Sequence, residues 1–146
     1  MVKVRDCFCS VSAGVDLVSP EATVEEVIAR VTRDPASRAV FVVDESQRLL
    51  GIIGVREILS VLGGKYSSER PFAQTRELLA TNAGDLMGAP FWVSPDDDLE
   101  EGLRIAVQQD LQDIPVVENG RVIGNLDCLE IIVNYRAARQ HQDEGE

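Results

Sequence analysis

The chain has 146 residues, of which 45% are hydrophobic and 27% charged, an ordinary composition for a compact globular protein. Its formal net charge is −11, with 9 Lys/Arg against 10 Asp/Glu in residues 1–73 and 5 against 15 in residues 74–146. It carries no basic stripe for a nucleic acid or an anionic membrane surface, so we expect neither as a partner.

The apolar segments and the cysteines indicate where the protein works. The longest apolar run covers only residues 49–55, whereas a bilayer span needs about 20, and the N-terminus lacks the apolar core of a signal peptide. Cys7, Cys9 and Cys128 form no even set and fit a reducing compartment. We therefore expect a cytoplasmic protein.

Metal binding and catalysis find no support in the residue types. His141 is the only histidine and lies in the tail, so a four-ligand zinc site is hard to assemble and no Ser-His or Cys-His pair can sit in a cleft. We expect no metal, no cofactor and no enzyme activity.

The first half predicts the order strand, helix, strand, strand, helix. The expected elements are a short strand at 15–18, a helix at 24–32 capped by Thr23, a buried strand at 39–43, its antiparallel partner at 49–53 and a helix at 56–62. Apolar residues at helical spacing define the helices, and runs of β-branched and aromatic residues define the strands.

The second half repeats this order. We expect a strand at 91–93, a helix at 99–109 capped by Asp98 with Leu103, Ala106 and Val107 facing inward, hairpin strands at 114–117 and 121–124 around Asn119-Gly120, and a helix at 129–136. Residues 65–82 form a linker with a helical pattern over 75–79. Residues 139–146 are too polar to pack and form a disordered acidic tail.

Equivalent positions in the two halves are nearly evenly spaced. Ser19 and Ser94 are 75 positions apart, Val42 and Val116 are 74 apart, and Gly51 and Gly124 are 73 apart. A lead-in precedes each copy, as Val4-Arg5-Asp6 and as Ala83-Gly84-Asp85. So small a drift indicates one structural unit built twice.

The repeated motifs resemble a known family. Each copy opens with Ser-Pro-x-x-(Thr/Asp)-(Leu/Val)-Glu-Glu, has a strand ending in Val-Val-acid, and has Gly before its last helix. Over residues 4–136 the chain resembles a tandem pair of CBS domains, a Bateman module. The resemblance implies an α/β fold of the α+β type, with two β-α-β-β-α repeats packed through their sheets about a pseudo-twofold axis. The first domain would cover 4–64, with its lead-in, and the second 83–138.

The resemblance also implies a function. Members of the family usually sense an adenosine-containing ligand, such as AMP, ADP, ATP or S-adenosylmethionine, in a cleft between the repeats, and commonly form homodimers. We therefore expect a free-standing regulatory module that changes its packing or its binding of a client protein. The alternative is a scaffold that binds no ligand and acts by dimerisation and protein–protein interaction.

The family's ligand motif is altered in both copies. In Gly-x-x-(Thr/Ser)-x-x-Asp the hydroxyl contacts phosphate and the Asp accepts from the ribose hydroxyls. Here Gly54 and Glu57 take these two positions in the first copy, and Asp127 and Glu130 take them in the second. Glutamate keeps the acceptor chemistry at a longer reach, whereas Asp127 would repel a phosphate. We therefore expect a nucleotide only at the first cleft.

Further residues complete the implied site. Val18 and Val40 would contact the base, Arg38 or Arg56 the phosphate, and Trp92 would stack on adenine. The alternatives are solvated arginines with a local acidic partner, a core or interface tryptophan, and motif glutamates that merely favour a helix N-terminus. The acidic run of residues 96–98, 100 and 101 indicates a helix start, since it lacks the spacing of a calcium loop.

Overall fold

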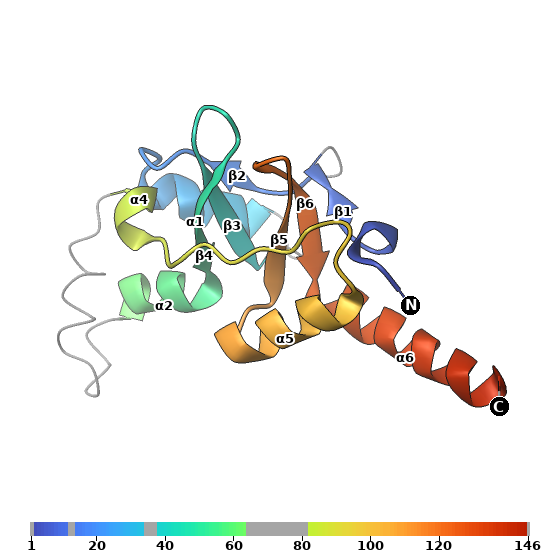
Figure 1. Ribbon diagram of the computed structural model, residues 1–146. Coiled ribbons are helices and arrows are strands. Elements are labelled where there is room, and N and C mark those ends of the chain that lie inside the picture. The colour runs from blue at the N-terminus through green and yellow to red at the C-terminus, as the bar shows by residue number, and fades with distance from the viewer. Residues whose placement is uncertain (1, 12–13, 34–37, 64–81, 146) are drawn as a thin grey trace. The chain divides into compact units, whose positions relative to one another are not determined.

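The computed structural model describes residues 2–11, 14–33, 38–63 and 82–145, and its elements are labelled in Figure 1. The chain divides into two compact units, Asp16–Pro90 and Met1–Val15 together with Phe91–Glu146. We call them the first unit and the second unit, after the repeat that forms most of each. The predicted linker lies almost wholly outside the described residues, as does its helical pattern over 75–79.

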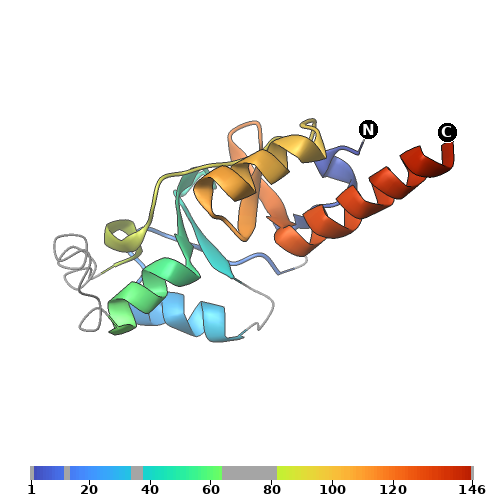
Figure 2. The ribbon, with the colours of Figure 1, turned by 90° about the horizontal axis from the view of Figure 1, so that it is seen from below.

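The first unit contains a three-stranded sheet packed against helices. Its elements are β2 (Leu17–Val18), α1 (Val24–Arg33), β3 (Ala39–Val43), β4 (Leu49–Gly54), α2 (Val55–Gly63) and α4 (Ala83–Leu86). The strand order is β2-β3-β4, with β2 parallel and β4 antiparallel to β3. Figure 2 shows α1 and α2 side by side against this sheet. The predicted order of elements is confirmed.

Helix α1 begins at the predicted residue because Thr23 and Glu26 close a capping box. The Glu26 N–H donates to Thr23 Oγ1 and the Thr23 N–H donates to Glu26 Oε2, both over 3.1 Å. Val27 follows and is fully buried in a core cluster with Val40 of β3 and Ile58 of α2. The cap thus fixes the helix register that turns the apolar face of α1 toward the sheet.

The second unit repeats this plan with a third strand from the N-terminus. Its elements are η1 (Val4–Asp6, a 3₁₀ turn), β1 (Cys9–Ser10), α5 (Leu99–Gln109), β5 (Asp113–Glu118), β6 (Arg121–Asp127) and α6 (Cys128–Gly145). The strand order is β1-β6-β5, antiparallel throughout. Asn119 and Gly120 have φ of 53° and 80°, the left-handed pair that an Asn-Gly hairpin turn requires.

The strand predicted at 91–93 is reduced to a single bridge between Val93 and Val116. The Val93 N–H donates to the Pro115 carbonyl, and the Val117 N–H donates to the Val93 carbonyl. The next donors along this parallel ladder would be the nitrogens of Pro115 and Pro95, which carry no hydrogen. In the first unit Phe41 stands where Pro115 does here, and its N–H donates to the Asp16 carbonyl over 3.0 Å.

Helix α5 spans the predicted residues, but its inward face differs from the prediction. Val107 is 73% exposed, whereas the buried positions are Leu99, Gly102 and Ile105. A Cβ on Gly102 would lie 2.6 Å from Leu126 Cδ2, so the helix makes its closest approach to the sheet at this glycine. The buried face is therefore centred on Gly102 and leaves Val107 outside it.

Helix α6 is longer than predicted. It continues to Gly145, so the prediction of a disordered tail from residue 139 is wrong for the backbone of 139–145. The segment contains neither proline nor glycine before Gly145, and so nothing in it breaks the helix. Among the described parts of the chain, no helix is both long and apolar enough to cross a bilayer.

The compact units do not follow the sequence repeats, because each lead-in packs on the other repeat. In the first lead-in the Val4 N–H donates to the Asp97 carbonyl over 2.9 Å, and in the second the Ala83 N–H donates to the Ala22 carbonyl over 2.8 Å. These two bonds join equivalent positions of the two copies, and the remaining contacts also match. The bridges Lys3↔Asp98 and Cys9↔Asn125 correspond to Asn82↔Thr23 and Gly88↔Ile52.

One glycine in each repeat makes room for the lead-in. A Cβ on Gly124 would lie 2.3 Å from the Cys9 carbonyl oxygen and 2.4 Å from Phe8 Cδ2. A Cβ on the equivalent Gly51 would lie 2.6 Å from the Gly88 carbonyl oxygen. Both obstacles include backbone, which cannot rotate away as a side chain can. The shared Gly of the two repeats is therefore required for packing of the lead-in.

We expect Gly124→Ala to lower the free energy of unfolding by about 2 kcal/mol or more, since an added methyl group overpacks this site. Urea denaturation followed by circular dichroism measures the change. Gly54→Ala is the comparison and should cost less, because its Cβ would meet, at 3.1 Å, only the end of the Glu57 side chain, which can shift as backbone cannot. Equal stability of Gly124→Ala and the natural chain would contradict the assigned role of the lead-in.

Candidate functional site

In the first unit, the motif residues gather at one end of the β3–β4 hairpin. Ala39 pairs with Gly54 across the two strands. Arg38, which precedes β3, and Arg56 and Glu57, in the first turn of α2, therefore stand at this same end. We call it the motif end of the hairpin.

Glu57 is held at the start of helix α2. Its Oε2 accepts a hydrogen bond of 3.0 Å from the Gly54 N–H, in partly buried surroundings. Gly54 immediately precedes the helix, so the bond is the glutamate half of a capping box. The structure thus gives Glu57 the helix-start role that was the alternative to ribose contact, and it leaves the ribose role as a prediction.

Two glycines border the Glu57 carboxylate. A Cβ on Gly54 would lie 3.1 Å from Oε2, and a Cβ on Gly88 would lie 3.4 Å from Oε1. A threonine or serine at position 54, as in the family motif, would crowd this carboxylate. The loss of the hydroxyl and the lengthening of the acid therefore belong together. Gly88 was missed by sequence reasoning, because it lies outside the motif.

The other candidates of the first unit are divided between the surface and the core. Arg38 and Arg56 are exposed, and each makes an interaction of its own in the structure. Val18 and Val40 lie in the core cluster that α1 and α2 cover, and Val40 is fully buried. This placement does not support contact of the Val40 side chain with a base, because helix and sheet residues already surround it.

The equivalent end of the second unit carries a carboxylate as well. Asp127 directly precedes α6, and its Oδ1 accepts a hydrogen bond of 2.7 Å from the Leu129 N–H. It thus caps the helix in the manner that Asp favours at this position. Glu130 is exposed, and its Oε2 lies 3.4 Å from Asn134 Nδ2 one turn on. Both acids are explained locally as part of a helix start.

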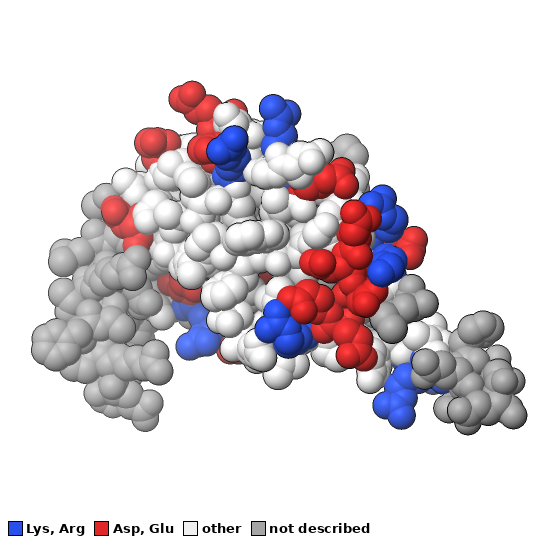
Figure 3. Space-filling model, in the orientation of Figure 1, with Lys and Arg blue, Asp and Glu red and all other residues white. Residues whose placement is uncertain are grey.

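Trp92 and the acidic run lie on the surface of the second unit. Trp92 is 53% exposed, so its ring is accessible and is not part of the core. Figure 3 shows acidic side chains gathered at the start of α5 with basic ones among them. Asp98 pairs with Lys3, Asp96 with Arg5 and Glu101 with Arg104. These ion pairs agree with the prediction of a helix start, and across the described residues no group of His, Cys, Asp or Glu is arranged to hold a metal ion.

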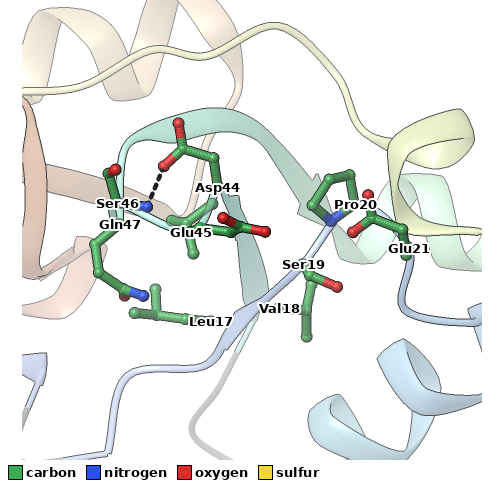
Figure 4. A pocket seen from close by; sticks show the side chains of 10 residues that line it. Leu17, Val18, Ser19, Pro20, Glu21, Asp44, Glu45, Ser46 and Gln47 are labelled. Carbon is green, nitrogen blue, oxygen red and sulfur yellow. Dashed lines mark hydrogen bonds between the residues drawn. The ribbon is translucent and has the colours of Figure 1, made fainter.

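A hollow of about 610 Å³ lies at the opposite end of the β3–β4 hairpin from Glu57. Its walls are Leu17–Glu21 and Val43–Gln47, and Figure 4 shows the polar side chains of the hairpin turn around it. Asp44 Oδ1 accepts from the Ser46 N–H over 2.8 Å and shapes this turn. Of the predicted site residues only Val18 reaches the hollow, which no sequence motif indicates.

Comparison with known proteins decides the family. A family model described as CBS domain matches residues 9–64 and again residues 83–135, which covers most of the chain and both repeats. The chain belongs to the CBS-domain family. No curated protein sequence matches it.

Solved structures of CBS proteins share its fold. A CBS domain-containing protein from Thermotoga maritima is 31% identical, with a TM-score of 0.77 over 91% of this chain and 93% of that one. The CBS-pair protein CBSX2 from Arabidopsis thaliana, solved in complex with AMP, is 22% identical, with a TM-score of 0.78 over 96% and 98%. The CBS domain pair of protein MJ0100, solved with 5′-methylthioadenosine and S-adenosyl-L-methionine, is 16% identical, with a TM-score of 0.74 over 94% and 98%.

Two cysteines of the second unit, Cys7 and Cys9, differ in environment. Cys7 is buried, and its Sγ contacts the Val4 carbonyl, whereas Cys9 is exposed on the edge strand β1. Burial raises the pKa of the Cys7 thiol, and the nearby carboxylates of Glu130 and Asp6 raise it further. Because the thiolate is the reactive form, Cys7 is protected twice, by its burial and by its pKa.

We expect iodoacetamide at pH 7.5 to label Cys9 roughly tenfold faster than Cys7. A raised pKa leaves less thiolate at any pH below it, so the rate at Cys7 should increase as the pH rises. Mass spectrometry of the two labelled peptides during a time course measures both rates, and labelling in urea provides the unfolded control. Equal rates in the folded protein would show that Cys7 is not buried as described.

Proposed function

We propose that this protein is a free-standing regulatory CBS pair that senses an adenosine-containing ligand at the motif end of the first repeat. The observation that carries the proposal is the carboxylate of Glu57, which accepts from the Gly54 N–H and stands at the motif position where the family has its ribose-binding Asp. Such a carboxylate is an acceptor that can bridge the two hydroxyls of a ribose. CBSX2 with AMP, and MJ0100 with adenosyl compounds, lend support as proteins of the same fold.

Sensing requires that the ligand binds one conformation better than another. A ligand at the start of α2 would either compete with the Gly54 N–H for the Glu57 carboxylate or donate to another acceptor position of the same carboxylate. Binding would then bias the conformation of the helix start and, through it, the affinity for a client protein. In this proposal the module works in the cytoplasm and performs no chemistry of its own.

A thermal-shift series with adenosine, S-adenosylmethionine, AMP, ADP and ATP tests the proposal. A ligand at a hundred times its Kd stabilises the native state by about 2.7 kcal/mol, so at least one compound should raise the Tm by several degrees. Glu57→Ala should abolish that shift. Glu45→Ala, in the turn at the other end of the same hairpin, should retain it. Absence of any shift at millimolar ligand would exclude the sensor.

A second candidate function is protein–protein association through helices α2 and α6, including homodimer formation. Each helix exposes an apolar stripe at helical spacing: Val55, Leu59 and Leu62 on α2, and Leu129, Ile132 and Val133 on α6. Contiguous apolar side chains on a helix are a typical mark of an interaction surface. We propose that these stripes mediate self-association, whether or not a ligand is bound.

We expect Leu59→Glu and Ile132→Glu, at equivalent positions of the two repeats, each to weaken self-association about thirtyfold or more. A buried carboxylate without a partner opposes assembly, whereas the fold tolerates it on an exposed face. Light scattering coupled to size exclusion measures the mass over a concentration series. Val107→Glu, on the exposed side of α5, is the matched control. A natural chain that stays monomeric at high concentration would eliminate this function.

A further inference from the structure

We propose that the first lead-in is held on the second unit by a salt-sensitive ionic latch, and that it is released while the rest of the unit stays folded. With its flanking residues this lead-in spans 2–10, and the latch consists of its two ion pairs with residues that precede α5. The inference concerns a conformational device and does not depend on the proposed ligand.

The two lead-ins dock through the same main-chain contacts. In each, two successive N–H groups donate to carbonyl groups that precede a helix. These bonds are 2.8–3.0 Å long and join Val4 to Asp97, Arg5 to Pro95, Ala83 to Ala22 and Gly84 to Pro20. Because the backbone holds both segments alike, differences in how firmly they dock arise from their side chains.

The first lead-in adds two ion pairs to these contacts. Lys3 Nζ lies 2.6 Å from Asp98 Oδ1, and Arg5 Nη2 lies 2.5 Å from Asp96 Oδ1. At the two equivalent positions the second lead-in carries uncharged residues, Asn82 and Gly84. Docking of the second lead-in therefore does not use charge at these positions, whereas docking of the first does.

Apart from the latch, the first lead-in has little regular structure to hold it. Its helix η1 is a single 3₁₀ turn, and its strand β1 has only two residues, both exposed. Segments of this kind open at a lower free energy than the core of a domain. Val4 is fully buried, which favours the docked state as long as the ion pairs assist it.

The latch lies in solvent, where salt acts on it. The side chains of Lys3 and Asp98 are 47% and 40% exposed, and those of Arg5 and Asp96 are 51% and 78% exposed. The range of an exposed charge falls from about 10 Å in 0.1 M salt to about 3 Å in 1 M salt. The hydrogen bonds to Asp98 and Asp96 raise the pKa of Lys3 and of Arg5. Both cations therefore stay charged at neutral pH, and salt is the variable that weakens the latch.

Release of the first lead-in uncovers two features of the second unit. The edge of β6 at Gly124 and Asn125 loses its partner strand β1, and the buried Cys7 thiol enters solvent. An open strand edge is a place where other extended segments pair. Ionic strength thus controls whether this edge is covered.

Hydrogen exchange of the whole chain, measured by mass spectrometry in low salt and in about 0.5 M sodium chloride, tests the inference. An exposed ion pair changes an equilibrium by up to about fivefold, so residues 4–10 should exchange about threefold faster or more in high salt. Residues 83–88 of the second lead-in are the internal control and should not respond. The amides of β5 should stay protected, because the release is local. An equal response of both lead-ins, no response of the first, or loss of protection in β5 would each overturn the inference.

Neutral variants attribute the effect to the latch. Asp96→Asn combined with Asp98→Asn should raise the exchange of residues 4–10 about threefold in low salt and remove most of its salt dependence. Asparagine still suits the start of α5, so the helix is spared. Glu21→Gln combined with Glu45→Gln makes the same change of net charge in the first unit, and Glu21 stands at the position equivalent to Asp96. This control should leave the exchange of both lead-ins unchanged. A full salt response in the Asp96 and Asp98 variant would overturn the role of these ion pairs.

Discussion

The fold depends on the close approach of a lead-in backbone to a glycine in the central hairpin of each unit. At Gly124 the Cys9 carbonyl and the Phe8 ring occupy the space of a side chain, and at Gly51 the Gly88 carbonyl and Met87 do so. Main-chain hydrogen bonds of the same pattern hold both lead-ins in place. A side chain at either glycine would push the lead-in away from the hairpin. This explains why glycine recurs at this position in both copies while its neighbours differ.

The exchange of lead-ins makes the two repeats interdependent. The first lead-in supplies Val4, fully buried in the core of the second unit, and the second supplies Ala83, fully buried in the core of the first. Either repeat alone would lose the strand or bridge that covers the edge of β6 or β4. An exposed strand edge is a site of unwanted pairing, so the exchange protects each sheet as well as filling each core. The sequence repeat and the folding unit are therefore different segments of chain.

Local signals in the sequence predicted most elements because their causes are local. The Thr23 cap of α1 and the Asn119-Gly120 turn depend on neighbouring residues, and both form as expected. Features decided by distant contacts were missed. The inward face of α5 is set by the approach of Gly102 to Leu126, and the short pairing at Val93 results from proline in a partner strand. The motif acids were recognised from sequence, but the Gly88 backbone beside Glu57 could not be, since its position depends on the packing of the second lead-in.

The altered motif of the first repeat is better understood as a coupled change than as decay. A glutamate in place of the family's aspartate adds a methylene, and the longer side chain turns back to accept from the Gly54 N–H. That path requires space at position 54, which glycine provides and threonine would fill. Loss of the hydroxyl alone would leave a helix start without a cap, and a side chain at position 54 beside the longer acid would require its carboxylate to shift. Together the two changes keep the helix capped and a carboxylate in place, and they remove the hydroxyl that the family motif offers to a phosphate.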